Sequence, residues 1–161
     1  MEQIALFDTK PPYKYIIDTC SILSQKDNGT HRRNVYRSQW EKIDEYIRQR
    51  IIIACSEIKD EILDEEISTW LKRLSCAVID IDNEVQENVV KIVTQHPNLV
   101  DFDKVKSSGD AFLIATAMKY DLIVITEENK EKHNKIPHIC GFFGIDCVNI
   151  TELCEREGWQ F

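Results

Sequence analysis

Four acidic residues stand where they could act together in catalysis: Asp18, Glu57, Asp110 and Glu128. Three of them, Asp18, Glu57 and Glu128, follow apolar runs typical of buried strands. Asp110 opens a small, apolar segment with helical character, and the preceding Gly109 permits a tight entry. In open parallel α/β sheets, ligands bind beyond the carboxyl ends of the strands. We therefore expect the four carboxylates to converge at that edge.

A cluster of carboxylates suits one kind of chemistry in particular. Carboxylates close together repel one another and resist joint ionisation, and a divalent cation relieves this repulsion. Mg²⁺ and Mn²⁺ prefer oxygen ligands and combine a few carboxylates with waters and substrate phosphate. Such ions lower the pKa of a bound water and orient it for attack on phosphorus. A cluster without a Cys/His or Ser/His dyad therefore predicts Mg²⁺- or Mn²⁺-dependent hydrolysis of phosphodiester bonds.

Each acid also has an ordinary structural explanation. An aspartate directly after a strand, such as Asp18, commonly starts a turn. Asp110 lies in the first turn of a predicted helix, where acidic residues are favoured, and Ser107 and Asp110 have the spacing of a capping box. Glu127 competes with Glu128 for the fourth position. The prediction therefore depends on the order of the four motifs, since any single acid among 28 is unremarkable.

The elements that must position these acids alternate along the chain. Short apolar runs predict strands, and apolar residues at helical spacing predict helices. The expected strands are residues 13–17, 51–54, 77–81, 122–126 and 147–150. The expected helices are residues 38–48, 64–74, 83–94 and 111–120, a short helix at Pro137 and a last helix from Thr151. The alternation predicts one domain over residues 1–161, with a three-layer α/β/α fold around a central, mainly parallel sheet.

Composition limits the class of protein. None of the six cysteines forms a C-x-x-C pair, so we expect reduced cysteines, mostly in the core of a cytoplasmic protein. No window approaches the length of a membrane span and the first residues lack a secretory pattern, so we expect no membrane association. The net charge of −8 argues against a protein that coats nucleic acid non-specifically.

The charge is distributed unevenly along the chain. Residues 1–50 contain nine Lys/Arg and seven Asp/Glu, a balance of +2, whereas the other 111 residues carry −10. Arg32, Arg33 and Arg37 are therefore the candidates for binding the phosphates of an RNA. A solvated loop and helix face is the alternative explanation for these arginines.

The motifs resemble those of the PIN-domain family. Residues 15–23, YIIDTCSIL, resemble its opening motif, a hydrophobic strand followed by Asp-Thr-Asn. Residues 56–58, SEI, resemble the second motif. Residues 109–117, GDAFLIATA, resemble the third, and residues 123–128, IVITEE, the fourth, which usually reads Thr-x-Asp. The end of the chain, with its IP-x-x-C and GWQF segments, resembles a PIN-like subfamily of uncharacterised proteins.

This resemblance implies a Rossmann-like fold, dependence on Mg²⁺ or Mn²⁺, and endonucleolytic cleavage of RNA. Many small members are VapC-type toxins, each blocked by a cognate antitoxin, and homodimers are common. By position in the motifs, Asp18, Asp110 and Glu128 would hold the metal. Glu57 would complete the catalytic site directly or through water, and the Thr126 hydroxyl would support the neighbouring carboxylates.

The chain departs from the family pattern at two positions. Cys20 replaces the usual Asn, which puts the hydrogen bond made by that Asn in doubt. Glu128 replaces the usual Asp, so Glu127 is a competing ligand or a supporting residue. Glu61, one helical turn after Glu57, could share the role of Glu57.

Two other interpretations are weighed against a nuclease. A haloacid-dehalogenase-like phosphatase needs a second Asp where Cys20 stands, and a receiver domain needs paired acids and a lysine that are not evident. The stronger alternative is a catalytically inert PIN fold that binds RNA or protein. All four motif positions are acidic, which favours the enzyme.

Overall fold

The centre of the molecule is a five-stranded parallel sheet. The computed structural model describes residues 11–57, 62–96, 108–128, 130–131 and 135–161. Within these ranges the strands are β1 (Tyr15–Ile17), β2 (Ile52–Cys55), β3 (Val78–Ile79), β4 (Ile123–Ile125) and β5 (Cys147–Val148). Their order is β3-β2-β1-β4-β5, and each neighbouring pair is parallel. The predicted parallel sheet is confirmed.

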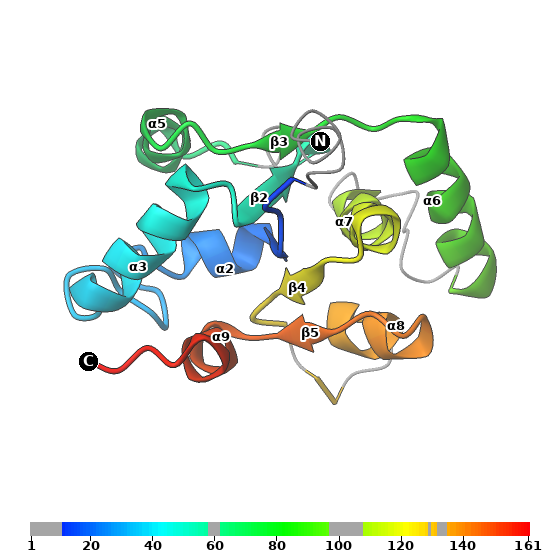
Figure 1. Cartoon of the computed structure of the whole chain (residues 1–161). Helices are drawn as coiled ribbons and strands as arrows, with labels where there is room; N and C mark the ends of the chain where they lie inside the picture. Colours follow the sequence, from blue (N-terminus) through cyan, green and yellow to red (C-terminus); the bar gives the residue numbers. More distant parts are fainter. Residues whose placement is uncertain (1–10, 58–61, 97–107, 129, 132–134) are drawn as a thin grey trace, which may run out of the picture.

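Helices cover both faces of this sheet (Figure 1). One face carries α2 (Thr19–Leu23), α3 (Arg37–Arg48), α5 (Glu65–Arg73) and α9 (Ile150–Glu157). The other carries α6 (Asn83–Gln95), α7 (Ser108–Tyr120) and α8 (Ile136–Phe142). The predicted three-layer α/β/α fold is therefore confirmed. Among the helices just named, none has the length and apolar character that crossing a membrane requires.

The central strands are buried because their side chains are apolar on both faces. All residues of β1 and β2 are inaccessible or nearly so, with at most 1% of their surface exposed. In the middle of the sheet, Tyr15 is paired with Ile52 on one side and with Ile123 on the other. Continuous apolar strands of this kind are typical of parallel sheets covered by helices on both faces.

Strand and helix ends differ by a few residues from the prediction. The predicted strand 77–81 is reduced to Val78–Ile79, because only Ala54 and Cys55 of β2 pair with it. The last helix begins one residue early because Asn149 caps it in a reciprocal pair of hydrogen bonds with Glu152. Individual hydrogen bonds determine the residue at which a strand or helix ends. The apolar pattern does not mark that residue, because apolar residues continue beyond the end of the element.

The α7 helix is enclosed by the rest of the fold, as its apolar sequence predicts. Its residues Ala111, Leu113 and Ala115 are at most 1% exposed. Asn88 of α6 donates a hydrogen bond to the Ala115 carbonyl at 3.2 Å. A tight turn, in which the Leu122 N–H donates to the Ala117 carbonyl at 3.0 Å, connects α7 directly to β4. Because α7 therefore runs antiparallel to β4, its first turn lies toward the carboxyl ends of the strands.

A charged and aromatic cluster fastens α9 to the first strand. The Glu157 carboxylate accepts hydrogen bonds from Lys14 at 2.7 Å, from Tyr46 at 2.6 Å and from the Tyr15 hydroxyl. Burial opposes ionisation, but these donors hold the pKa of Glu157 at about 2. Trp159 packs edge-on against Tyr46, with ring centroids 4.8 Å apart. The cluster thus links residues about 140 positions apart in sequence.

Candidate active site

The strand order places a topological switch point between β1 and β4. From β1 the sheet continues to β2 and β3 on one side and to β4 and β5 on the other. Ligands of open α/β sheets bind at such points, beyond the carboxyl ends of the strands. Asp18 follows β1 and Thr126 follows β4, and the Asp18 N–H donates to the Ile125 carbonyl at 2.9 Å. The fold therefore brings two of the predicted site residues to the place where a ligand is expected.

Asp18 is a buried carboxylate held by three donors. It is 6% exposed. Its Oδ1 accepts from the Thr19 N–H at 2.8 Å, and its Oδ2 accepts from the Cys20 thiol at 2.9 Å and the Thr126 hydroxyl at 2.8 Å. Burial raises the pKa of Asp18, and the three hydrogen bonds lower it without cancelling the effect of burial. A buried, oriented carboxyl with a raised pKa is a candidate functional group.

Cys20 links the ends of β1 and β4. Its sulfur accepts from the Glu127 N–H at 3.4 Å and lies 3.4 Å from the Thr126 hydroxyl oxygen, in addition to donating to Asp18. Burial and the charge of Asp18 raise the pKa of Cys20 to about 12, so the thiol keeps the proton that it donates. The thiol thus donates to the Asp18 carboxylate from the position at which the PIN motif usually has Asn. The only signal for this role in the sequence was the position of Cys20, two residues after Asp18.

Glu128 lies within electrostatic reach of Asp18. The Glu128 N–H donates to the Thr126 hydroxyl oxygen at 3.2 Å, and its Oε1 accepts from the Ile136 N–H, the first of α8, at 3.4 Å. Burial, and then the charge of Asp18, raise the pKa of Glu128, although the Ile136 N–H and Lys135 oppose them. The charge of Asp18 thus disfavours ionisation of the neighbouring Glu128 carboxyl.

The neighbouring Glu127 has different surroundings. Its Oε1 accepts from the Ile150 N–H at the start of α9 at 2.8 Å, and its Oε2 lies 3.5 Å from Nε2 of His31. A carboxylate at the N-terminus of a helix stabilises that helix. Both oxygens of Glu127 therefore have contacts within the fold, and its backbone N–H supports Cys20.

Asp110, Glu57 and Glu61 are the other acids predicted for the site. Asp110 is half-buried in the first turn of α7, on the side of the sheet where the strands end. Glu57 is half-buried two residues after β2, in a short helical segment that begins at Ser56. The predicted role of Glu61 falls outside the described residues. The structure thus shows hydrogen bonds among Asp18, Thr126 and the loop carrying Glu128, and it places Asp110 and Glu57 near the carboxyl ends of the strands.

The carboxylates can be tested for their fit to a divalent metal. Within the described part of the chain, no three Asp, Glu, His or Cys side chains form a group that could hold a metal ion. Mg²⁺, however, is commonly held by one or two carboxylates, with waters and substrate phosphates completing its shell. The pair Asp18 and Glu128 has that composition. A cation held by these carboxylates would offset the burial that raises both pKa values and the charge of Asp18 that raises the pKa of Glu128. The donor set fits such an ion.

Arg33, one of the three arginines predicted to bind phosphates, makes its contacts within the fold. Its Nη1 and Nη2 each donate to Asp44 at 2.8 Å, and its Nε donates to Gln25 at 3.0 Å. The guanidinium lies 5.4 Å and 5.5 Å from the ring centroids of Trp40 and Trp70. The sequence prediction missed this network, although Asp44 falls on the apolar stripe of α3 and so had to find a buried partner.

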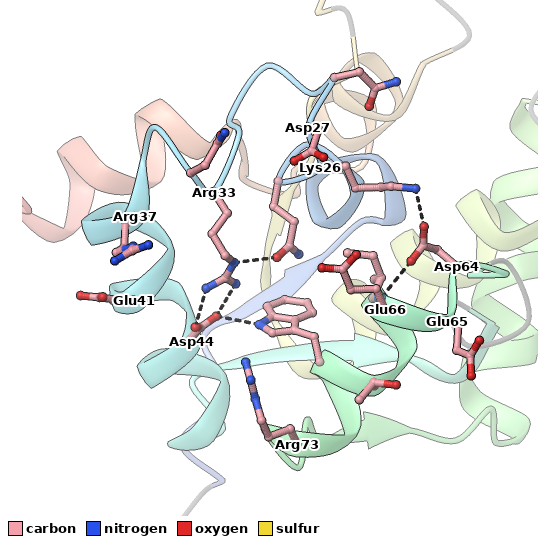
Figure 2. Close-up of a pocket in the computed structure, with 16 residues that line it drawn as sticks. Lys26, Asp27, Arg33, Arg37, Glu41, Asp44, Asp64, Glu65, Glu66 and Arg73 are labelled. Atoms are coloured by element: carbon pink, nitrogen blue, oxygen red, sulfur yellow. Dashed lines mark hydrogen bonds and ion pairs between the residues drawn. The ribbon is translucent and has the colours of Figure 1, made fainter.

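The Arg33 network forms part of a groove between α3, α5 and residues 25–34 (Figure 2). The groove has a volume of about 1500 Å³, and Figure 2 shows Arg33 reaching Asp44 and Lys26 reaching Asp64 within it. Its lining includes the four cationic side chains Lys26, Arg33, Arg37 and Arg73, and the six carboxylates Asp27, Glu41, Asp44, Asp64, Glu65 and Glu66. An excess of carboxylates disfavours the RNA backbone in this groove.

The other two candidate arginines are exposed. Arg32 donates from its Nε to the Gly29 carbonyl at 3.0 Å, and Arg37 lines the groove from the first turn of α3. The roles of Arg32, Arg33 and Arg37 in RNA binding stay predictions. Because Arg33 is engaged with Asp44 and Arg37 lines the acidic groove, Arg32 is the better candidate.

Comparisons with known proteins show the family and the fold. No curated protein matches the chain. Among solved structures, the crystal structure of PAE2754 from Pyrobaculum aerophilum is similar, with a TM-score of 0.56 and 14% identity over 96% of this chain and 95% of that one. At this identity the similarity bears on the fold alone, and it agrees with the three layers described above. Residues 15–161 match the family model described as "Domain of unknown function (DUF4411)". The chain therefore belongs to the DUF4411 family.

Proposed function

We propose that the protein is a Mg²⁺- or Mn²⁺-dependent endoribonuclease of the PIN-domain type, which hydrolyses RNA phosphodiester bonds. One observation carries the proposal: at the switch point of the sheet, Asp18 and Glu128 each have a raised pKa, and the charge of Asp18 contributes to that of Glu128. A fold gains no stability from such a pair. Carboxylates kept in this state are expected where a cation and an anionic substrate bind.

In this proposal Asp18 and Glu128 hold the ion, and Asp110 joins them from the first turn of α7. When bound, the ion supplies a water of lowered pKa and offsets the charge that develops on the phosphate. Glu57, after β2, would orient that water directly or through another water. These roles follow the motif positions, and they are supported by the placement of all four acids near the carboxyl ends of the strands.

The surrounding residues prepare the Asp18 carboxylate for this task. The Thr126 hydroxyl and the Cys20 thiol both donate to Oδ2, while the Thr19 N–H occupies Oδ1. Three donors fix the plane of the carboxylate, so that the lone pair left on Oδ1 has a set direction before any ligand arrives. Hydrogen bonds of this kind around a metal ligand orient it and tune its affinity.

The proposal is tested by RNA cleavage with and without divalent metal. The purified chain should cut tRNA, ribosomal RNA or mRNA in Mg²⁺ or Mn²⁺ and lose this activity in a chelator. The variant Asp110→Asn should be slower by orders of magnitude with its fold intact, because it loses a ligand charge at nearly constant shape. Glu41→Gln, an exposed change on α3, is the matched control. Undiminished cleavage by Asp110→Asn in chelator would contradict the assignment.

The alternative is a catalytically inert PIN-type module that binds RNA or protein. It is favoured by the finding that, among the described residues, no group of three potential ligands is assembled for a metal. Thermal unfolding separates the two functions. Mn²⁺ at about 100 times its dissociation constant should stabilise a metal enzyme by about 2.7 kcal/mol. An inert module should show no such effect, and its RNA binding should not depend on the metal.

We further propose that the protein is the toxin of a toxin–antitoxin pair in the cytoplasm and forms a homodimer. This finer proposal is supported by the resemblance of the motifs to VapC-type toxins. Expression without the partner should arrest growth, and Glu128→Gln should relieve the arrest at equal protein level. Equal arrest by both proteins would contradict a nuclease toxin. Light scattering of the purified chain measures the oligomeric state.

A further inference from the structure

Tyr36 and His31 form an aromatic pair in the loop that connects α2 to α3. Their ring centroids are 5.9 Å apart, and the ring planes are inclined by 55°. Tyr36 is the N-cap residue of α3 and is 46% exposed, whereas the His31 side chain is 13% exposed. One ring is therefore packed within the fold, and the other lies against it with much of its surface open to solvent.

Hydrogen bonds hold the inner ring of this pair in place. The His31 N–H donates to the Ser24 carbonyl at 3.0 Å, and the Trp40 indole donates to the His31 carbonyl at 2.6 Å. Nδ1 of His31 lies 3.3 Å from the side-chain nitrogen of Gln39. The ring on which Tyr36 packs is thus fixed before any ligand binds, and such preorganisation reduces the entropy cost of binding.

The aromatic pair adjoins the acid site. Nε2 of His31 lies 3.5 Å from Oε2 of Glu127, and Glu127 directly precedes Glu128. In Figure 1 the loop between α2 and α3 lies beyond the carboxyl ends of β4 and β5, on the same side of the sheet as the acids. An RNA held at the acids can therefore reach Tyr36 with a nucleotide near the cleaved bond.

The chemistry of the loop suits a nucleotide at this place. Arg32 is exposed and lies one turn before Tyr36, whose N–H donates to the Arg32 carbonyl at 2.8 Å. The Nε of Arg32 donates to the Gly29 carbonyl at 3.0 Å, which orients the guanidinium. Proteins that bind single-stranded nucleic acids combine positive charge along the backbone with aromatic rings on which bases stack. Arg32 and Tyr36 provide both features within one turn of the chain.

We propose that the exposed face of Tyr36 is a subsite on which one unpaired nucleobase of the RNA stacks. The proposal rests on the proposed function, because it takes RNA as the ligand of the adjacent acid site. A base inside a duplex has both faces covered by its neighbours, so only an unpaired base can stack on Tyr36. Every base has a π-face, so the contact does not depend on the identity of the base. The subsite thus selects unpaired segments without reading their sequence.

Binding of a short, fluorescently labelled single-stranded RNA tests the proposal. The measurement is made at low salt in chelator, where the proposed cleavage is blocked. Tyr36→Ala should raise the Kd by about 5- to 150-fold, which corresponds to the loss of one stacked base. Tyr36→Phe keeps the ring and should bind as tightly as wild type. A duplex RNA of the same length should bind equally to all three proteins, because it has no base to stack on Tyr36.

Phe142→Ala is the matched control for Tyr36→Ala. Phe142 is 59% exposed and also pairs with a histidine, His96, with ring centroids 4.7 Å apart. It ends α8, shortly before the start of β5, and so lies at the opposite edge of the sheet from the acids. Its replacement should leave the Kd for single-stranded RNA unchanged. Equal binding by wild type and Tyr36→Ala, or an equal loss in Phe142→Ala, would overturn the proposal.

Photocrosslinking of the wild-type protein makes the test independent of how the variants fold. Single-stranded RNA that contains 5-iodouridine should give, after irradiation, a linked peptide that includes Tyr36. Linkage only to peptides without Tyr36 would contradict the subsite.

The result is separable from that of the proposed nuclease. Binding that depends on Tyr36, without any metal-dependent cleavage, would support the subsite and contradict the nuclease. Metal-dependent cleavage by a protein whose RNA binding does not depend on Tyr36 would support the nuclease and contradict the subsite.

Discussion

The surroundings of the carboxylates affect their ionisation in opposite directions in two regions of the molecule. At the switch point, burial raises the pKa of Asp18, and burial and the charge of Asp18 raise that of Glu128. In the groove between α3 and α5, a hydrogen bond from Lys26 lowers the pKa of Asp64, and Arg33 neutralises Asp44. Ionised carboxylates are thus unfavourable in the first region and stabilising in the second. The difference teaches which acids to test for function, because a fold has no structural reason to retain unfavourable charges.

The largest expected effect is on RNA cleavage by Asp18→Asn. A metal ligand contributes several kcal/mol to the transition state, and about 1.4 kcal/mol corresponds to a factor of ten in rate. We therefore expect the cleavage rate to fall by about 100-fold or more, while circular dichroism shows an intact fold. Asp64→Asn, the matched change in the groove, should keep wild-type activity. Equal loss of activity in both variants would remove the functional distinction between the two regions.

The next largest effect is on the free energy of unfolding, after a substitution in the groove between α3 and α5. Arg33→Met removes both Arg33 donors to Asp44, a residue that is 6% exposed. Among the described side chains, Asp44 then keeps the hydrogen bond from Trp70 at 2.9 Å. Breaking a buried ion pair costs about 3–5 kcal/mol, and because Arg33 is partly exposed we expect a loss of about 3 kcal/mol. Urea unfolding measures the loss. Arg37→Met, which changes an exposed arginine of the same groove, should cost much less, and a similar cost would refute the buried-pair explanation.

A smaller effect on cleavage is expected at Cys20. Cys20→Ala removes a donor to Asp18, and loss of such a partner of a metal ligand typically costs about 10- to 100-fold in activity or metal affinity. Cys20→Asn restores a donor of the kind usual in the PIN family and should retain more activity than Cys20→Ala. The dissociation constant for Mn²⁺ should change in parallel with activity. Mn²⁺ affinity in Cys20→Ala equal to that of wild type would mean that Cys20 only fills space.

The smallest effect is a pH dependence of opposite sign in the two regions. A raised folded-state pKa contributes stability below the ordinary value, which is 3.8 for Asp18, and this stability is lost as pH rises through the raised value. A lowered pKa, as in Asp64, contributes stability above 3.8 that is lost as pH falls. In chelator, Asp18→Asn should therefore gain stability relative to wild type from about pH 4 to about pH 7. Asp64→Asn should be less stable than wild type at every pH above about 4, and this difference should shrink as the pH falls below 3.8.

Calorimetric midpoints of the two variants and of wild type, measured across this range, provide the comparison. Shifts of the same sign for Asp18→Asn and Asp64→Asn would show that the two carboxylates do not differ in the way described. Added Mn²⁺ should reduce the gain of Asp18→Asn, because the cation compensates the charge that the variant lacks.

The strands and helices could be predicted because their apolar patterns are local. The runs around Ile53 and Val124 identify buried strands without reference to any other part of the chain. The roles of Glu127 and Glu128 could not be separated in this way. They are adjacent in sequence, and their surroundings differ because α9, more than 20 residues later, presents the Ile150 N–H to Glu127. The Arg33 network likewise depends on Trp70 of a different helix.

The cluster around Glu157 determines how late in synthesis the fold around the acid site can be completed. β1 is made early, but the Tyr15 hydroxyl has its acceptor on a residue made 142 positions later. The same late segment supplies the Ile150 N–H that engages Glu127, beside the loop carrying Glu128. We therefore expect a ribosome-bound chain shorter than residue 157 to lack the finished acid site. A nuclease built in this way would stay inactive toward the messenger from which it is being translated.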